Sequence, residues 1–151
     1  MNYTYFAARS DAVAAAVLNW PAGPYEPPTP ARAAGLLSEP VDGVGFSQEL
    51  GHYARLVLGP DSDMDLEDWE HRIAATNDER RVVLRLPPAL VRAVADSDLD
   101  HLHGLVPVSA QYPYFADPDP VGRLHAFAAD LHRLCRAATG NTGGVYSYGW
   151  A

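Results

Sequence analysis

Residues 117–151 read DPDPVGRLHAFAADLHRLCRAATGNTGGVYSYGWA, and this stretch predicts a long helix followed by a strand. Asp119 offers a side-chain oxygen to cap the helix, and Pro120 stands where a missing backbone N–H costs nothing. We expect Gly140 to end the helix in a left-handed C-cap. Apolar residues recur three or four positions apart and form one stripe: Val121, Leu124, Phe127, Ala128, Leu131, Leu134, Cys135 and Ala138.

The residues after this helix predict a strand with two unlike faces. Tyr146, Tyr148 and Trp150 share one face, and small residues share the other. Large aromatic side chains on one face indicate that the strand lies against a layer of helices. The rest of the chain is expected to pack around this helix and strand.

The N-terminal part predicts a strand and then a helix. Asn2–Ala8 is rich in aromatic and β-favouring residues, so we interpret it as a strand. Ser10 is expected to cap a helix that Pro21 ends. Residues 21–40 hold six prolines and form a surface connection within the domain, with Pro21–Pro28 stiff and extended.

The middle of the chain predicts short elements bounded by proline and glycine. Leu105–Tyr114 is expected to be an edge strand or an extended segment, because Pro107 and Pro113 interrupt it. The other expected elements are a helix from Thr29-Pro30 to Leu37, a short strand at Val41–Val44, a helix capped by Ser47 and ended by Gly59-Pro60, a helix at Asp65–Ala75, a strand at Arg80–Leu86, a helix at Ala89–Ala95 and a turn at Ser97–Leu102.

This order of elements shows no regular strand-helix-strand repeat and predicts a single α+β domain over residues 1–151. We expect a small mixed or antiparallel sheet that contains the N-terminal, Arg80–Leu86 and C-terminal strands. Several helices should cover it, and the long C-terminal helix should be followed by the final strand.

Composition excludes some functions. The net charge of -8 makes nucleic acid and anionic membranes poor partners and favours a basic protein partner. All eleven basic residues are Arg, so Schiff-base and P-loop mechanisms, which require Lys, are excluded. Abundant Arg, Ala and Pro indicate a high-GC bacterium. One Cys, no leader and no long apolar run indicate a cytoplasmic protein; the oligomeric state stays open.

Two motifs contain metal-ligand residue types. Asp61-x-Asp63-x-Asp65 begins like a calcium loop, but Leu66 and Arg72 stand where glycine and glutamate are required, so a solvated loop explains it better. His101-x-His103 lies beside acids and has zinc-ligand types. On a helical turn these two histidines would point apart and be surface residues, and nothing obvious completes a site. We therefore predict no metal and no cofactor.

No catalytic set assembles from the remaining reactive residues. Cys135 lies on the apolar stripe and is predicted to be an inert core thiol. Ser47 is better explained as a helix cap than as a nucleophile. His125 and His132 lie seven apart, at the margins of the stripe.

Aromatic side chains are the remaining unusual feature. Tyr112, Tyr114 and Phe115 lie on a proline-broken segment, Tyr25 lies in the proline-rich connection, and more aromatics lie near the C-terminus. Clustered tyrosines are good recognition residues, but they also pack well in cores. The candidate binding residues are Tyr112, Tyr114, Phe115, His101 and His103.

The ends of the chain resemble a known family. Tyr5-Phe6-Ala7 followed by a helix, together with a long terminal helix and a short hydrophobic final strand, is similar to the YfbM-like family of small bacterial proteins. The resemblance covers about the first twenty and the last thirty residues. It implies an α+β domain and supplies no catalytic residues.

Two hypotheses for function follow. The first is a small acidic binding or regulatory protein, such as an immunity-type inhibitor whose acidic face blocks a basic protein partner. The second is a small enzyme or ligand-binding domain, with a pocket of histidines and tyrosines drawn from distant parts of the chain.

Overall fold

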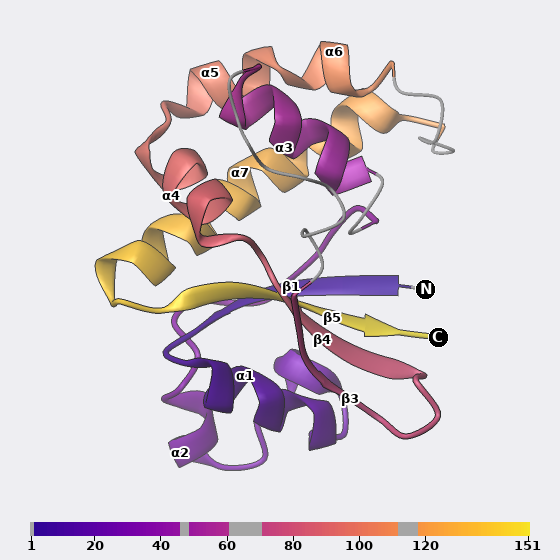
Figure 1. Cartoon of the computed structure of the whole chain (residues 1–151), viewed down its shortest axis with the longest axis vertical. Coiled ribbons are helices and arrows are strands. Elements are labelled where there is room, and N and C mark those ends of the chain that lie inside the picture. Colours follow the sequence, from indigo (N-terminus) through magenta and orange to yellow (C-terminus); the bar gives the residue numbers. More distant parts are fainter. Residues whose placement is uncertain (1, 46–48, 61–70, 112–117) are drawn as a thin grey trace.

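Five antiparallel strands form one sheet in the spatial order β2-β1-β5-β4-β3 (Figure 1). The computed structural model describes residues 2–45, 49–60, 71–111 and 118–151. The strands are β1 (Asn2–Ala8), β2 (Val41–Asp42), β3 (His71–Ala75), β4 (Arg81–Arg85) and β5 (Gly144–Trp150). The first and last strands of the chain therefore pair with each other inside the sheet.

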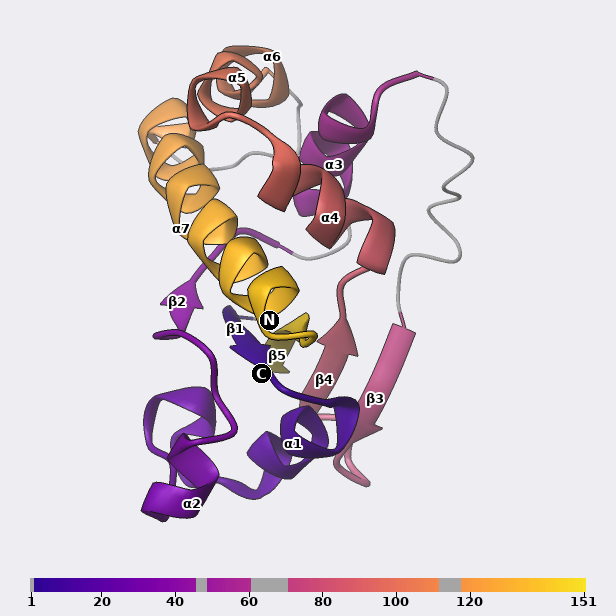
Figure 2. The same ribbon diagram turned by 90° about the vertical axis from the view of Figure 1, so that its left-hand side faces the viewer.

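Helices cover both faces of this sheet, which confirms the predicted α+β class (Figure 2). One face carries α3 (Gly51–Leu58), α4 (Pro88–Asp96), α5 (Leu99–Gly104), α6 (Val106–Ser109) and α7 (Pro120–Gly140). The opposite face carries α1 (Asp11–Ala16), the 3-10 turns η1 (Val17–Asn19) and η2 (Gly23–Tyr25), and α2 (Pro30–Ala33). None of the described helices has both the length and the apolar character that a membrane crossing requires.

The long helix α7 begins where its capping residue predicts. The Asp119 carboxylate accepts the backbone N–H of Gly122 at 3.0 Å, and Pro120 occupies the first turn. The predicted end is wrong in detail, since Gly140 remains helical and Thr142 takes the positive φ of 57°. The Ala138 carbonyl accepts the N–H groups of Asn141 and Gly143, which closes the last turn.

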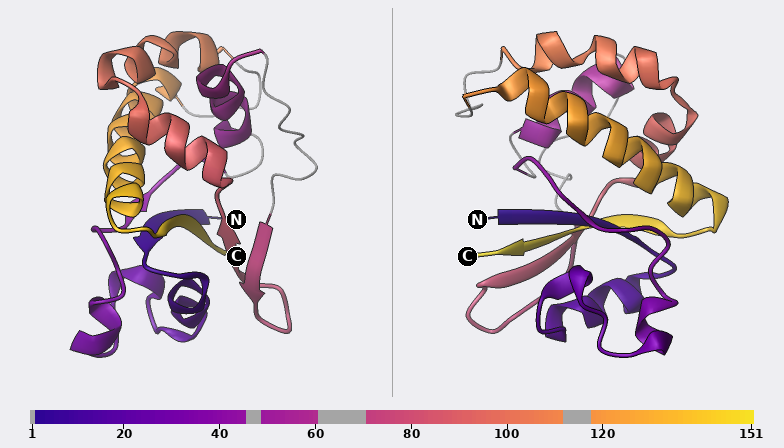
Figure 3. Two further views of the ribbon diagram at one scale, coloured as in Figure 1. Left: turned by 60° about the vertical axis from the view of Figure 1, so that its left-hand side comes forward. Right: turned by 180° about the vertical axis from the view of Figure 1, so that it is seen from behind.

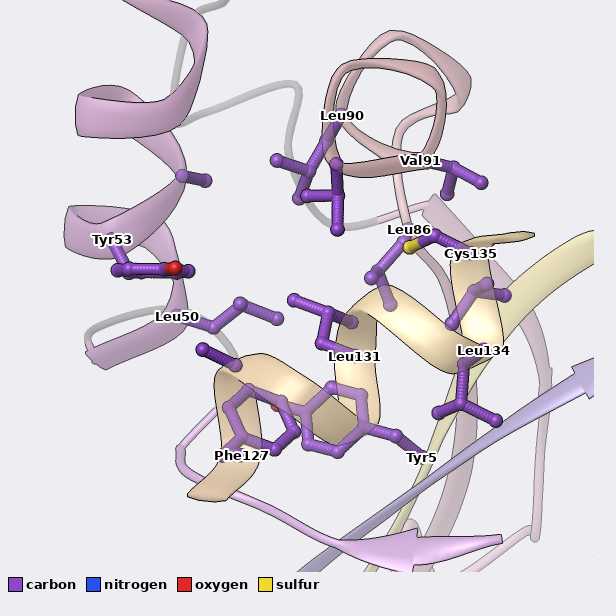
Figure 4. Close-up of a cluster of buried hydrophobic side chains, with 14 of the residues drawn as sticks. Tyr5, Leu50, Tyr53, Leu86, Leu90, Val91, Phe127, Leu131, Leu134 and Cys135 are labelled. Atoms are coloured by element: carbon purple, nitrogen blue, oxygen red, sulfur yellow. The ribbon is translucent and has the colours of Figure 1, made fainter. Parts of the chain in front are cut away.

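The apolar stripe of α7 builds the larger core (Figure 4). Leu131 is fully buried, and Phe127 lies against Tyr5 of β1 with ring centroids 4.9 Å apart. Cys135 is buried as predicted, and its burial raises the pKa of the thiol. Val121 departs from the prediction, because it lies in the first turn and is 45% exposed.

A second core lies on the α1 face of the sheet. The Phe6 ring stacks on Tyr146 at 5.6 Å between centroids, and Val17 and Trp20 cover them. The Tyr146 hydroxyl donates to Asp11 at 2.7 Å, which ties the start of α1 to β5. The aromatic face of β5 thus packs against α1, as its pattern predicts, while Val145 on the other face joins the larger core.

Other elements expected from the sequence are present in the structure, with ends that differ from the predicted ones. The Asn2–Ala8 strand is confirmed, and Ser10 caps α1 by accepting the N–H of Val13. Thr29 caps α2, which is shorter than predicted. The predicted cap Ser47 lies outside the described residues.

Three segments fold differently from their predictions. His71–Ala75, expected to end a helix, is strand β3, because β4 pairs with it. Val106–Ser109, expected to be extended, is helix α6, because Pro107 lies in its first turn, where a missing N–H is harmless. Pro21–Pro28 is not simply an extended surface segment, since Gly23–Tyr25 forms a 3-10 turn in which Gly23 and Pro24 are buried.

We predict that Leu131→Ala lowers the free energy of unfolding by about 2–5 kcal/mol, because it leaves a cavity in the larger core. Urea denaturation measures this change. Val121→Ala on the same helix is the control, and its effect should stay within about 0.5 kcal/mol. Equal effects of the two variants would contradict the assignment of the buried stripe.

Candidate functional site

The helices on the α1 face leave one end of the sheet uncovered. In the strand register, Thr4 of β1 lies opposite Asp42 of β2 on one side and Tyr148 of β5 on the other. Two residues further along β5, Trp150 lies opposite Arg81 of β4. Alternation puts these side chains on the same face as Tyr146, which packs under α1. Figure 3 shows both termini at this end of the sheet, near the turn between β3 and β4.

A hollow of about 960 Å³ opens where the helical layer ends. Its lining comes from β1, β2, β4, β5, the η2 region and the β3–β4 turn. The residues are Thr4, Pro21, Ala22, Tyr25, Asp42, Thr76, Asn77, Asp78, Arg80, Arg81, Tyr148, Trp150 and Ala151.

Asp42 forms the acidic wall of the hollow. One oxygen of its carboxylate, Oδ1, accepts both the Thr4 hydroxyl at 3.0 Å and the Tyr25 hydroxyl at 2.9 Å. Within the described part of the chain, no Arg or His forms an ion pair with Asp42. The carboxylate is therefore oriented by two neutral donors, and no cation among the described residues matches its charge.

Tyr25 is held beside Asp42 as a hydrogen-bond donor. Desolvation, together with the hydrogen bond to Asp42 and its charge, raises the pKa of Tyr25 to about 12. The hydroxyl therefore keeps its proton at neutral pH. Tyr25 is 49% exposed, so part of its surface remains available to a ligand.

Aromatic rings form the floor. Tyr148 is 6% exposed, whereas Trp150, two residues further along β5, is 45% exposed. Gly23 has a φ of 58°, and a Cβ added there would lie 2.7 Å from the Tyr148 ring. Only glycine suits both this backbone and this close approach, which positions Tyr25 two residues later.

The β3–β4 turn forms the opposite wall. The Asp78 carboxylate accepts the Thr76 hydroxyl at 2.7 Å and the backbone N–H of Arg80 at 3.2 Å, which lowers the pKa of Asp78. Arg80 also pairs with Asp78 through a nitrogen-to-oxygen distance of 3.7 Å. No acid in the described residues pairs with Arg81, so this wall presents one uncompensated guanidinium.

The predicted histidines lie elsewhere. His101 is exposed on α5, while His103 stacks on His125 of α7 with ring centroids 3.5 Å apart, so the pair on α5 points apart as expected. His132 lies at the margin of the stripe, where a ring nitrogen is 3.1 Å from the Ser97 carbonyl oxygen. Across the described ranges, no group of three or more His, Cys, Asp or Glu could hold a metal ion.

The other candidate binding residues, Tyr112, Tyr114 and Phe115, lie outside the described residues, as does the acidic run 61–70. The sequence had marked Tyr25, Tyr148 and Trp150 as unusual aromatics, and these do meet in the hollow. Asp42 and Arg81 gave no local signal, since their importance comes from strand register.

Comparison with family models, with curated proteins and with solved structures found no match to this chain. The resemblance to the YfbM-like family therefore remains a prediction. The chemistry of the hollow has to be judged from its own residues. A carboxylate, a guanidinium and exposed aromatic rings are groups that bind ligands.

We predict that Gly23→Ala destabilises the protein by at least about 1 kcal/mol, because the positive φ and the Tyr148 ring both oppose a Cβ. Gly140→Ala is the matched control, because a Cβ there meets nothing and the residue is helical. Its effect should be neutral or stabilising. Thermal unfolding of both variants measures the contrast, and an unchanged Gly23→Ala variant would contradict the described packing.

We predict that Asp42→Asn lowers the pKa of Tyr25 from about 12, because desolvation remains but the hydrogen bond to a carboxylate and its charge, which also favour the neutral phenol, are lost. NMR titration of the Tyr25 ring carbon follows the ionisation. Since the folded-state pKa is raised, the stabilisation linked to Tyr25 is complete below pH 10 and is lost as the pH rises toward 12. Tyr25→Phe should remove the part of the stability loss at alkaline pH that comes from Tyr25.

Proposed function

We propose that this protein is a binding protein that captures a basic side chain of a protein partner in the hollow at the end of the sheet. The observation that carries this proposal is the Asp42 carboxylate, which two hydroxyl groups orient and which no cation in the described residues neutralises. An oriented carboxylate with a free oxygen is a good acceptor for a guanidinium or ammonium group.

The surroundings of Asp42 support the proposal that it binds a basic side chain. Its second oxygen, Oδ2, accepts no bond from the described residues and can receive a donor from a partner. A hydrogen bond to a charged group is worth about 1.5–3 kcal/mol. The exposed ring of Tyr25 offers a face for the same cation, and it does so at a low cost in side-chain entropy.

The net charge of the whole chain acts over a longer range. A charge of -8 attracts basic partners and speeds their diffusional encounter, in a manner that salt weakens. Where the captured side chain belongs to the active surface of the partner, binding blocks that surface. Under this proposal, the hollow would be the site of the immunity-type role that the composition predicts.

A ligand-binding role is the second candidate, and the volume of the hollow favours it. About 960 Å³ lies within the range of small-molecule sites, roughly 300–1,000 Å³. Tyrosines line the hollow as that hypothesis expects, but none of the described lining residues is a histidine. A small cationic ligand would then occupy the place of the basic side chain.

We predict that the peptide acetyl-Gly-Arg-Gly-amide binds in the hollow and that Asp42→Asn weakens its binding by about 10-fold or more, since an ionic hydrogen bond is lost. Chemical-shift titration measures the dissociation constant and reports on Tyr25, Tyr148 and Trp150. The matched peptide with citrulline in place of Arg should bind as weakly to the wild type as the Arg peptide binds to the variant.

Glu26→Gln is the matched control variant. Glu26 is exposed beside Tyr25, lies outside the lining of the hollow and changes the net charge equally. It should reduce the affinity only slightly. Equal losses in the two variants would show that long-range charge alone attracts the peptide, and the proposed site would be wrong. Tight binding of free cations such as agmatine, without a gain from peptide flanks, would favour the small-molecule candidate.

A further inference from the structure

The hollow has two charged ends of opposite sign, Asp42 and Arg81, and the proposed function assigns a ligand group only to Asp42. Arg81 faces the hollow from β4, directly opposite Trp150 on β5. The neighbouring acid, Asp78, is already occupied by Thr76 and Arg80. Arg81 therefore presents its guanidinium without an acidic partner among the described residues.

Strand register separates the two charges. Asp42 lies opposite Thr4, Thr4 opposite Tyr148, and Tyr148 opposite Val83, so three strand spacings divide β2 from β4. Arg81 lies two residues further along β4. With about 4.8 Å between strands and about 3.3 Å per residue, the two Cα atoms are roughly 16 Å apart. Among the ion pairs of the described residues, none joins Asp42 to Arg81.

The surface between the charges suits a peptide. Tyr148 and the half-exposed Trp150 supply an aromatic floor on which an extended chain can lie. A strongly basic segment fits poorly here, because a second positive charge would approach Arg81. A segment with one basic and one acidic side chain matches both ends.

We propose that the hollow recognises an extended protein segment in which a basic residue bound by Asp42 is followed or preceded by an acidic residue bound by Arg81. An extended chain advances about 3.3 Å per residue, so 16 Å spans about five residues between Cα positions. The reach of both side chains shortens this to a spacing of about two to four residues. The inference rests on the proposed function, because it assigns the second half of the same site.

Peptide pairs test this inference. Acetyl-Arg-(Gly)n-Glu-amide is compared with acetyl-Arg-(Gly)n-Gln-amide, with one, two or three glycines, by chemical-shift titration or calorimetry. The wild type should prefer the Glu peptide by about 10-fold at the best spacing, as expected for one added ionic hydrogen bond. Arg81→Gln should abolish this preference, and Arg81→Lys should retain part of it.

Arg72→Gln is the matched control, because Arg72 lies on the neighbouring strand β3, is paired with Glu79 and lies outside the lining of the hollow. It should leave the preference for the Glu peptide in place. Arg81 is exposed, so its variants are expected to unfold at the wild-type temperature, and thermal unfolding checks this.

The outcomes separate the two proposals. If both peptides bind through Asp42 with equal affinity at every spacing, or if Arg81→Gln keeps the preference, the inference is wrong while the proposed function stands. If neither peptide binds, or if Asp42→Asn leaves both affinities unchanged, the proposed function fails and the inference fails with it.

Discussion

The pairing of β1 with β5 is the interaction on which the rest of the structure depends. Seven residues of each strand pair without interruption, from Asn2 opposite Trp150 to Ala8 opposite Gly144. The pair lies inside the sheet, between β2 and β4, so both of its faces need to be covered. Both cores therefore contain residues from the two ends of the described chain.

Side-chain alternation along this pair divides the protein into its two cores. Tyr5 and Ala7 face α7, whereas Phe6 and Ala8 face α1. A shift of one residue in register would exchange these sets and place Tyr146 and Tyr148 under α7. Aromatic packing on both faces therefore holds the register that also places Thr4, Tyr148 and Trp150 in the hollow.

The hollow exists because the strands extend further than the helices that cover them. The α1 layer ends near η2, where Gly23 packs on Tyr148, and β1 and β5 continue beyond it to the two termini. Asp42 lies on one side of this uncovered end and Arg81 on the other, and neither forms an ion pair with another described residue. A surface of this kind is stabilised by a partner that supplies the missing charges, which is why binding is the function that we propose.

Local periodicity in the sequence was sufficient to predict α7, β1, β5 and the α+β class, because these segments carry long apolar patterns and clear caps. It also predicted the buried position of Cys135, and it marked Tyr25, Tyr148 and Trp150 as unusual aromatics without placing them in one site. It failed at His71–Ala75, where pairing with β4 overrides a helical spacing, and at Val106–Ser109, where proline starts a helix instead of interrupting a strand.

The site itself was decided by the tertiary structure. Asp42 and Arg81 belong to strands about forty residues apart in the sequence, and nothing around either residue marks it as a binding group. Strand register brings both to one face of the sheet, and the end of the helical layer leaves that face open. The local sequence pattern indicates which residues share a helix or a strand. Which distant strands pair with each other depends on packing across the whole chain.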